Sequence, residues 1–506
     1  MARRSRRQTG SPLRRIEQLP FAEITNPYPP VGLVSEDELQ ALHDSSMRIL
    51  EEIGLEIVSN KARELMLSHG AEIDPRTGYV TFDRNLITDA IATIPETFLF
   101  HARNPVFNRV YGKNHLNFTT VASAPNSSDL DRGRRSGNFD DYCKFLKLGQ
   151  IFNVISCFSG YPVEPTDLPA HTRHLDAYQA FIKLTEKPWS VYCLGNGRVE
   201  DAIEMICMAR SINHEQLKQE PSITTVVNTN SPLKVDAPML EGLMTMAEFG
   251  QPVVVTPFTL AGAMSPVTLA GALSQQNAEA LGVLAVTQMV NPGAPAMYGG
   301  FTSNVDMKSG SPAFGTPEYA KAVIIGGQLA RKYRIPYRTS NVNAANCVDA
   351  QAAWESGMSL WAAVMAHGNM IKHGAGWLEG GLCASFEKFM IDIEMVQMMS
   401  EFLKPVQVGE SELAFEAIRE VGAGGHFFGT AHTIERYQNA FYHPLCSDWS
   451  NFESWAENGR IQAAERANRL YKYALDEYQT PPLDEAVGES IDEYVHIRKQ
   501  ELKPSW

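Results

Sequence analysis

Short apolar runs alternate with longer amphipathic segments between about residue 116 and residue 404. Eight of these runs are rich in β-branched and aromatic residues and end in turn-forming residues, which is typical of buried strands. Strands that alternate with helices favour a parallel sheet, and eight repeats predict a (β/α)8 TIM barrel of the α/β class. The predicted strands are 117–123, 153–160, 189–195, 222–230, 252–259, 294–301, 335–341 and 369–377, and the predicted helices are 199–213, 238–249, 275–290, 317–333 and 349–366.

The interval 349–366 has the most regular helical pattern. Asp349 is suited to cap its start. Large apolar residues then follow at steps of four, three and four, which places them on one face of a helix. We expect this stripe to pack into the core. Its members are Trp354, Met358, Trp361 and Met365.

The chain on either side of the predicted barrel, 116–404, has a different pattern. Residues 1–34 are rich in arginine and proline, so we expect a disordered basic arm there. An acidic helix start at Ser35 opens a small α+β segment over 35–115. Residues 405–506 return to acid-rich helical sequence with aromatic clusters. We expect this part to be a helical extension that wraps the barrel or forms an oligomer contact.

Composition and charge restrict the classes of partner. The net charge of the 506 residues is −14, although the first fifteen include six arginines and no acid, so nucleic acid is not expected as a main partner. No apolar stretch approaches the length of a membrane span. Seven cysteines form no CxxC pair and no secretory apolar region follows the arginines, which favours reduced thiols and a cytoplasmic location.

The predicted strand ends carry neutral hydrogen-bonding groups and aromatic rings, while lysine and arginine are sparse there. Barrel enzymes place their sites at these ends. Ring faces together with a carboxylate suit a quaternary ammonium, whose charge is spread over methyl groups that donate no strong hydrogen bond. Tyr298, Phe301 and Trp377 are candidates for the ring faces, and Glu379 for the countercharge. A purely structural role for the same residues stays open, as fillers of the barrel end and as a helix cap.

His373 is the second chemical candidate at a strand end. It is suited either to a structural hydrogen bond, or to donating one to a substrate carboxylate, or to carrying a proton near neutral pH. The sequence has no HExxH and no paired-cysteine spacing, so no metal site is predicted. It also has no Walker or GxGxxG fingerprint for a nucleotide and no GxSxG for a serine hydrolase. The interval 131–136, DRGRRS, is predicted to be a surface loop after the first strand.

Four segments together resemble the trimethylamine methyltransferase (MttB) superfamily, over about residues 35–470. They are 162-PVEPTDLPAHTRHL-175, 341-NVNAANCVDAQAAWESGMSLWAAV-364, 373-HGAGWLEGGLCASFEKFMIDIEM-395 and 425-GHFFGTAHTIERY-437. The resemblance implies a (β/α)8 barrel that moves a methyl group from an amine to the Co(I) of a separate corrinoid protein. It therefore implies no tightly bound cofactor in this chain.

The resemblance also implies what the substrate is. Archaeal trimethylamine enzymes of this superfamily carry pyrrolysine inside the barrel, and this chain has none. We place the counterpart of pyrrolysine within 343–348, at Asn346. Members without pyrrolysine resemble demethylases of glycine betaine, proline betaine or carnitine, in which a neutral tertiary amine leaves. On this hypothesis His373 and Glu379 act in catalysis, and His373, with Asn230 or Asn341, binds the substrate carboxylate.

Other hypotheses stay open beside this one. A barrel of this kind is also suited to transfer methyl from a betaine to tetrahydrofolate or a thiol, or to bind betaines without turnover. The expected partners are a small methylated amine, a corrinoid protein and further copies of the chain. Methionine- and aromatic-rich helices such as 395–403 are the reason for expecting a homo-oligomer.

Overall fold

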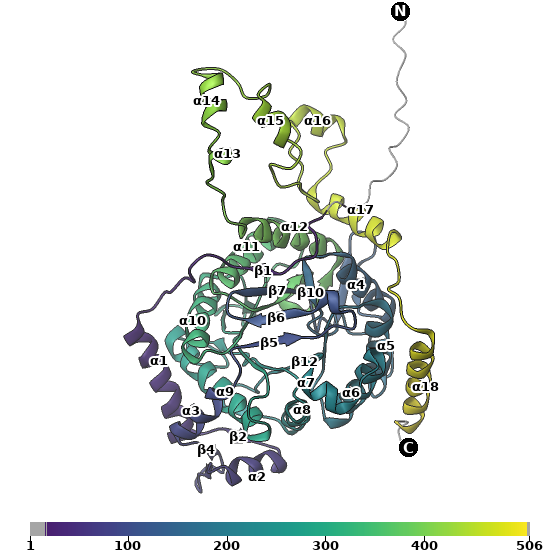
Figure 1. Ribbon diagram of the computed structural model, residues 1–506. Coiled ribbons are helices and arrows are strands. Elements are labelled where there is room, and N and C mark those ends of the chain that lie inside the picture. The colour runs from purple at the N-terminus through teal and green to yellow at the C-terminus, as the bar shows by residue number, and fades with distance from the viewer. Residues whose placement is uncertain (1–15, 17, 503–506) are drawn as a thin grey trace, which may run out of the picture.

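The centre of the molecule is a curled sheet, seen here in a computed structural model that describes residues 16 and 18–502 (Figure 1). Within the described residues, eight of its strands run parallel. The first and last of them along the chain, β7 and β20, are neighbours. In spatial order they are β10 (Ile155–Cys157), β7 (His115–Thr120), β20 (Met370–Ala375), β19 (Tyr337–Ser340), β16 (Ala296–Gly299), β14 (Val253–Val255), β12 (Ile223–Val227) and β11 (Trp189–Val191).

The ladder is interrupted between β10 and β11. At this point the amide of Phe158 donates a hydrogen bond of 2.9 Å to the carbonyl of Pro188, which links the two neighbouring segments. The predicted α/β class and all eight predicted strands are confirmed. A helix follows each strand and covers the outer face of the sheet (Figure 1). These helices are α4 (Phe139–Ile151), α5 (Arg173–Leu184), α6 (Asn196–Arg210), α8 (Ala237–Glu248), α9 (Leu269–Val290), α10 (Pro317–Tyr333), α11 (Ala350–Met365) and α12 (Phe386–Phe402).

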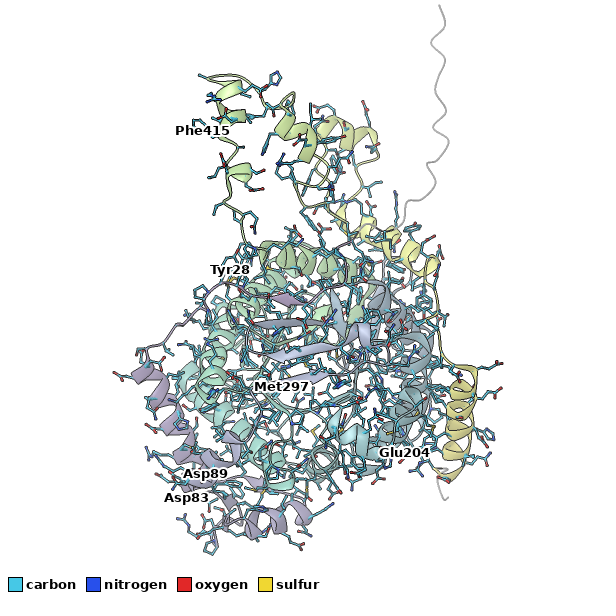
Figure 2. All side chains as sticks on the ribbon, viewed as in Figure 1. Tyr28, Asp83, Asp89, Glu204, Met297 and Phe415 are labelled. Carbon is cyan, nitrogen blue, oxygen red and sulfur yellow. The ribbon has the colours of Figure 1, made fainter. Side chains whose placement is uncertain are left out.

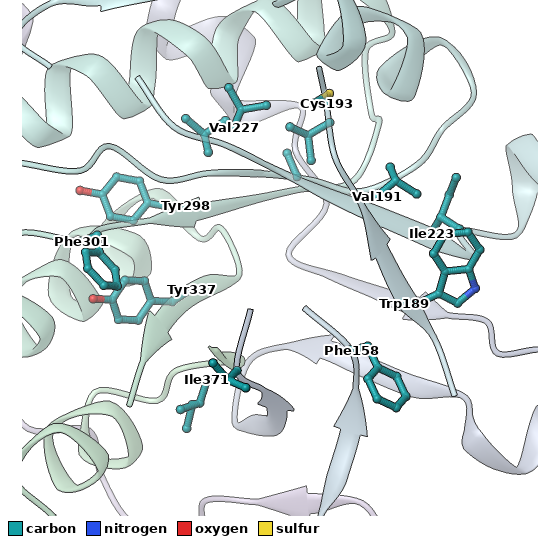
Figure 3. Close-up of a cluster of buried hydrophobic side chains, with 14 of the residues drawn as sticks. Phe158, Trp189, Val191, Cys193, Ile223, Val227, Tyr298, Phe301, Tyr337 and Ile371 are labelled. Atoms are coloured by element: carbon teal, nitrogen blue, oxygen red, sulfur yellow. The ribbon is translucent and has the colours of Figure 1, made fainter. Parts of the chain in front are cut away.

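The core lies between this sheet and its helices. Figure 3 shows part of it, with Trp189, Ile223 and Val227 among the buried side chains that the strands contribute. Phe181 of α5 stacks on Trp189 with ring centroids 5.2 Å apart. Alternate residues of each strand point the other way, into the curl of the sheet, and these determine where a ligand can enter.

The hairpin of β5 (Thr97–Phe100) and β6 (Arg109–Gly112) covers one end of the curled sheet (Figure 1). Its Phe100 and Tyr111 form a separate buried cluster with four side chains of the barrel strands and their ends. Those four are Cys157, Val254, Met297 and Met370, of which Met297 is marked near the centre of Figure 2. The amino-terminal ends of the strands are therefore filled, and open space inside the sheet is restricted to the carboxyl ends.

The rest of the segment before β7 packs against α8, α9 and α10. A capping box of Ser35 and Glu38 starts its first helix, as the acidic sequence predicts. Its elements are α1 (Glu36–Arg48), η1 (Ile49–Ile53), β2 (Glu56–Ile57), α2 (Asn60–Ser68), β3 (Glu72–Ile73), β4 (Val80–Thr81), α3 (Arg84–Ala92) and η2 (Pro105–Phe107).

Residues 18–34, expected to belong to a disordered arm, instead lie along the body of the protein. Strand β1 (Ile24–Thr25) pairs antiparallel with β7. Asn26 donates through Nδ2 to the carbonyl of Val364 over 2.9 Å, so this segment also ties β7 to α11. The arginine-rich part of the predicted arm, residues 1–15, lies outside the described residues.

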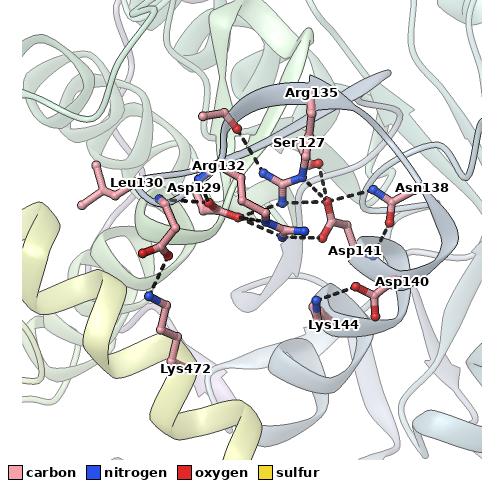
Figure 4. Close-up of polar contacts among 12 residues, drawn as sticks. Ser127, Asp129, Leu130, Arg132, Arg135, Asn138, Asp140, Asp141, Lys144 and Lys472 are labelled. Atoms are coloured by element: carbon pink, nitrogen blue, oxygen red, sulfur yellow. Dashed lines mark hydrogen bonds and ion pairs between the residues drawn. The ribbon is translucent and has the colours of Figure 1, made fainter.

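The interval 131–136 is part of a hairpin, which corrects the expectation of a simple surface loop. Strands β8 (Asn126–Asp129) and β9 (Gly133–Ser136) join β21 (Trp377–Leu378) and β22 (Cys383–Ser385) in a small sheet at the carboxyl ends of the barrel strands. The arginines of this interval pair with two buried carboxylates, which accounts for their presence in a folded hairpin (Figure 4). Arg135 lies 2.8 Å from Asp129 and 2.7 Å from Asp141, and Arg132 pairs with both acids as well.

Helix α11 corrects a second expectation. Its large apolar stripe faces outward, with Trp354 62%, Met358 46% and Trp361 41% exposed. The buried face instead combines small residues with two branched aliphatic ones, Leu360 and Val364. The small residues are Ala352, Ser356, Ser359, Ala362 and Ala363. Small side chains let the helix approach the sheet closely, so the large ones were left on the outer side. The spacing correctly predicted that they share a face, but not which face is covered.

The part after α12 leaves the body and returns to it. Short helices α13 (Glu410–Leu413), α14 (Phe415–Val421), α15 (Ala431–Arg436) and α16 (Phe452–Glu457) stand away from the barrel (Figure 1). Amides of Leu445 and Cys446 donate to Glu394 of α12 and anchor the chain. Helix α17 (Ala463–Asp476) packs on α12, and α18 (Glu485–Glu501) packs on α5 and α6. None of the helices in the described residues is both long and apolar enough to cross a membrane.

We expect replacement of Asp141 by alanine to destabilise the fold. Burial raises the pKa of Asp141. The hydrogen bond from Ser127 and the charges of Arg135 and Arg132 together lower it by more, so the pKa of Asp141 lies below its ordinary value. Removing this carboxylate leaves Arg132 and Arg135 with Asp129 as the shared acid and takes one ionic hydrogen-bond partner from each, which costs about 1–3 kcal/mol. Thermal unfolding should show a lower Tm for Asp141→Ala. The exposed neighbour Asp140, which pairs only with Lys144, provides the control (Figure 4); equal Tm values for the two variants would contradict the prediction.

Candidate active site

A cavity of about 660 Å³ opens at the carboxyl ends of the barrel strands. Most of its wall comes from the strands and the loops that follow them, and Arg173, Arg198 and Met239 come from the first turns of α5, α6 and α8. Aromatic residues of the wall are Tyr161, Tyr192, Phe258, Phe301 and Trp377, and its ionisable residues are Glu164, Arg173, Tyr192, Arg198, Arg338, Lys372, His373 and the thiol of Cys193. The cavity therefore combines ring faces with an excess of basic groups.

His373 and Trp377 form one wall. Their ring centroids are 4.1 Å apart, and both side chains are buried. The amide of Ala122 donates to His373 Nδ1 over 3.2 Å, which fixes Nδ1 as the acceptor and leaves the proton on Nε2. Burial, and then the charges of Lys372 and Arg338, hold the pKa of His373 well below its ordinary value. The imidazole is therefore neutral and presents an N–H donor rather than a positive charge.

The glycines around Trp377 allow this tight wall. Gly376 and Gly381 have φ values of +103° and +100°, and Gly380 one of +61°. A Cβ at Gly381 would lie 2.5 Å from the indole of Trp377, so glycine is required there for the ring to lie against the backbone. The chain thus folds back sharply after β20 and keeps the indole over the cavity. The glycines of this segment are therefore needed for one defined backbone conformation and do not indicate a flexible loop.

Asn343 holds Trp377 from the other side, a role that the sequence did not reveal. Its Nδ2 donates to the carbonyl of Trp377 over 2.7 Å, and the indole N–H of Trp377 donates back to the carbonyl of Asn343 over 3.2 Å. The indole N–H, the polar group of the ring, is therefore already hydrogen-bonded within the protein. Its apolar ring remains for contact with a ligand.

Phe301 forms the adjoining wall after β16. Its ring centroid lies 6.1 Å from that of Trp377, 6.4 Å from that of His373 and 5.3 Å from that of Phe258. Phe314 packs behind Phe301 at 5.4 Å in an edge-to-face arrangement. Four rings therefore converge on one part of the cavity, and a further aromatic side chain fixes them from outside.

Two basic side chains lie deep in the cavity, which corrects the expectation that lysine and arginine are sparse at the strand ends. Arg338 of β19 and Lys372 of β20 are only 3% and 5% exposed. Burial lowers the pKa of Arg338 to about 10. Burial, and then the charge of Arg338, hold the pKa of Lys372 well below its ordinary value. Both residues lie within runs of apolar strand residues, before the strand ends on which the expectation was based, and that position is the sequence signal for them.

A third group of ionisable residues lies nearer the rim. Glu164 follows β10, and its carboxylate is 3.7 Å from Arg173. Burial raises the pKa of Glu164 above its ordinary value, against the opposing effect of Arg173. Tyr192 shares a hydrogen bond of 2.9 Å with Ser123 and packs on Tyr161 with ring centroids 4.4 Å apart. The cavity wall therefore offers one carboxylate, and it comes from a residue that the sequence did not single out.

The remaining predicted site residues lie outside the cavity wall. Arg134 of β9 binds both carboxylate oxygens of Glu379 through Nε, at 3.1 and 2.8 Å, so Glu379 fastens the Trp377 loop to the small sheet. Tyr298 is fully buried and accepts a hydrogen bond from Gln276.

The three predicted asparagines lie outside it as well. Asn341 is buried and donates to the carbonyl of Gly374 and to Asp392. Asn230 is exposed and accepts from the amide of Asp236, and Asn346 is exposed. Of the predicted set, the structure thus brings His373, Phe301 and Trp377 together. Across the described part of the chain, no group of three or more His, Cys, Asp and Glu residues is arranged to hold a metal ion.

Comparison with known proteins identifies the family. The family model described as Trimethylamine methyltransferase (MTTB) matches residues 1–503. The chain belongs to this family. It is 34% identical to the glycine betaine methyltransferase of Desulfitobacterium hafniense over 94% of this chain and 98% of that protein. It is 28% identical to the trimethylamine methyltransferase MttB2 of Methanosarcina mazei over 90% of this chain and 92% of that protein.

Solved structures show a more distant likeness. The crystal structure of the hydroxylamine MtmB complex matches with a TM-score of 0.47 and 10% identity, over 93% of this chain and 95% of the other. The Methanosarcina barkeri monomethylamine methyltransferase MtmB matches with a TM-score of 0.45 and 10% identity, over 88% and 95%. The sequence-based assignment to the superfamily and to methyltransferases is confirmed by the family match and by the relatives named above.

We expect Gly381→Ala to loosen the wall that carries Trp377. Alanine at this positive φ costs about 1–2 kcal/mol of backbone strain, and its Cβ also collides with the indole. Hydrogen–deuterium exchange should be faster in peptides that cover 376–385. Gly293→Ala is the matched control, because Gly293 has a φ of +89° and open space around its Cβ. If both variants leave exchange at 376–385 unchanged, Gly381 does not determine the position of Trp377.

Proposed function

We propose that this chain is a corrinoid-dependent methyltransferase that takes a methyl group from a quaternary amine of the betaine type. It works as a (β/α)8 barrel with its site at the carboxyl ends of the strands, and its methyl acceptor is the corrinoid of a separate protein. The observation that carries the proposal is the convergence of Phe258, Phe301, His373 and Trp377 on one cavity. Membership of the family supports methyl transfer from a methylated amine.

The rings are suited to hold the methylated nitrogen. Each aromatic face within about 6 Å of a cation contributes about 0.5–2 kcal/mol, and the larger values apply to desolvated sites. Phe301 and Trp377 are both less than a tenth exposed, so their faces lie in such a site. Glu164 provides the countercharge in this proposal, because it lines the cavity, whereas Glu379 lies outside the cavity wall.

The contribution of the chain to the reaction is binding, orientation and exclusion of water. A reduced corrinoid, held by a partner protein at the cavity mouth, would supply the nucleophile that accepts the methyl group. The nitrogen leaves as a neutral tertiary amine, so the protein has no proton to deliver in this step. Phe301 and Trp377 hold the nitrogen against the wall, and the N–H of neutral His373 orients the other end of the substrate. The catalytic role proposed for His373 is therefore positioning.

The mouth of the cavity is suited to a partner protein. Large apolar side chains are exposed on the loops that follow the strands, and a bound protein would cover them. They are Leu194, Val267, Met307 and Leu382, of which Leu194 and Leu382 line the cavity itself. We place the reaction in the cytoplasm, where thiols stay reduced; all seven cysteines lie in described positions and are free.

The proposal predicts methyl transfer to reduced cobalamin. Under strictly anaerobic conditions, the protein with glycine betaine and chemically reduced free cob(I)alamin should produce methylcobalamin, followed by its visible spectrum, and dimethylglycine, measured by mass spectrometry. Trp377→Ala should lower the rate at least tenfold through loss of the wall, whereas the exposed Trp354→Ala should keep it. Betaine binding without any methyl transfer, even to corrinoid proteins from a betaine-grown organism, would instead support a binding protein. Transfer to tetrahydrofolate in the absence of corrinoid would support the other acceptor.

A further inference from the structure

We infer that Arg338 and Lys372 form a carboxylate-binding site on the floor of the cavity, so that the substrate is an ammonium compound that also carries a carboxylate. This inference rests on the proposed function and narrows its substrate class. It excludes trimethylamine and choline-like amines, which have no anionic group.

The strand register places both side chains inside the barrel. Arg338 pairs with Met370 across β19 and β20, and Lys372 pairs with Ser340, two residues further along. Met370 belongs to the apolar cluster that fills the amino-terminal end of the barrel. Positions that differ by two residues share a face of the sheet. Arg338 and Lys372 therefore point inward, where they form the first polar layer above the filled end.

Neither basic side chain has a partner of opposite sign within residues 18–502. Arg338 Nε is buried without a hydrogen bond, and Nη1 reaches the carbonyl of Gly300 only at 3.5 Å. Among the described residues, no hydrogen bond or ion pair to Lys372 Nζ is formed. The one carboxylate in the cavity wall, Glu164, lies beside Arg173 on the loop after β10. Buried cations without a partner are unfavourable, and an anion that enters between them removes this cost.

The shape of the site restricts the anion. A guanidinium binds a carboxylate through two parallel hydrogen bonds, and an ammonium adds a third donor. The guanidinium carbon of Arg338 lies 5.2 Å from the ring centroid of Phe301. The anion site and the ring wall therefore adjoin. A compound with a short link between its carboxylate and its methylated nitrogen occupies both at once.

Three ligands separate the two halves of the site without any mutation. Glycine betaine carries both charges, 3,3-dimethylbutanoate has the same shape with a neutral carbon in place of nitrogen, and choline keeps the cation but has no carboxylate. We expect calorimetric titration to give tightest binding for glycine betaine and at least tenfold weaker binding for choline. Choline binding as tight as betaine would overturn the carboxylate site. If 3,3-dimethylbutanoate binds as tightly as betaine, the carboxylate site stands but the ammonium-binding wall of the proposed function fails.

Variants then assign the site to its residues. Arg338→Met and Lys372→Met keep the length of the side chains and should each weaken betaine at least tenfold while leaving choline unchanged. The matched control is Arg109→Met, at an arginine of β6 that is also buried, has its Nε without a hydrogen bond and lies outside the cavity wall. Because the substitutions remove buried charges that have no partner, we expect melting temperatures no lower than that of the wild type. Unchanged betaine affinity in both folded variants would overturn the assignment.

A second inference comes from exposed apolar surface far from the cavity. We propose that the projecting arm, residues 405–461, covers the α11–α12 patch of a second copy of the chain. The α11–α12 patch consists of Trp354, Met358, Trp361, Met398 and Phe402, all at least 41% exposed. Trp361 and Phe402 pack against each other with ring centroids 4.9 Å apart, so the two helices present one continuous surface.

The arm has matching apolar surface that its own subunit leaves uncovered. Its five most prominent aromatic residues are 65–85% exposed, and they are Phe415, Phe428, Phe441, Trp449 and Phe452. Aromatic side chains bury roughly 150–250 Å² each. Five of them thus provide on the order of 700 Å², close to the roughly 800 Å² that each partner contributes to a stable interface. An exchange of arms between two copies covers two such surfaces around a twofold axis.

Light scattering coupled to gel filtration tests the exchange. We expect a dimer for the wild type, and monomers for Phe428→Asp in the arm and for Trp354→Asp in the patch. The control is Val106→Asp, at a residue that is 69% exposed and lies outside both surfaces. A monomeric wild type at micromolar concentration would overturn the proposal, as would dimers that persist in both variants.

Discussion

The interior of the curled sheet can be covered only from its two ends, and this constraint determines the rest of the molecule. The β5–β6 hairpin seals one end with Phe100 and Tyr111, so side chains of the lowest layer meet apolar partners. The next inward side chains have no such cover above them. Two of them, Arg338 and Lys372, are basic groups that are almost completely buried. The base of the cavity therefore holds basic side chains without an acidic partner, and aromatic rings form much of the wall above them.

This arrangement gives the cavity two ends of different character. The floor attracts an anion and repels a cation, while the ring wall attracts a cation that donates no strong hydrogen bonds. A ligand with a single charge interacts favourably with only one of these two ends and leaves the other end without a partner of opposite sign. A zwitterion satisfies both, and its orientation is fixed because reversal would place like charges together. Neutral His373 fits between the two, since it donates a hydrogen bond without adding a third charge.

The alternation of apolar runs and amphipathic segments was sufficient to predict the α/β class, all eight strands and the five predicted helices. Local patterns were sufficient because strand and helix periodicity depend on residues close in sequence. The predicted strand ends also placed His373, Phe301 and Trp377 in one candidate site, and the structure brings their rings together, while their part in the function stays a prediction. They did not reveal Asn343, whose exchange of hydrogen bonds with Trp377 depends on a contact across the fold. Glu379 was assigned to the cavity because it is close to Trp377 in sequence, yet Arg134, distant in sequence, binds it in the small sheet.

Two of the expectations that the structure corrected have a common physical origin. The stripe on α11 was expected in the core, and the strand ends were expected to lack basic residues. In both cases the sequence shows which side chains share a face but not what lies opposite that face. On α11 the opposite side, which consists of small residues together with Leu360 and Val364, packs on the body, so Trp354 and Trp361 are left for another surface. In the barrel the inward face of β19 and β20 meets open space, so Arg338 and Lys372 are left for a ligand. Both uncovered surfaces therefore indicate a missing partner, and its chemistry follows from the groups exposed: apolar rings on the helix, and an anion in the cavity.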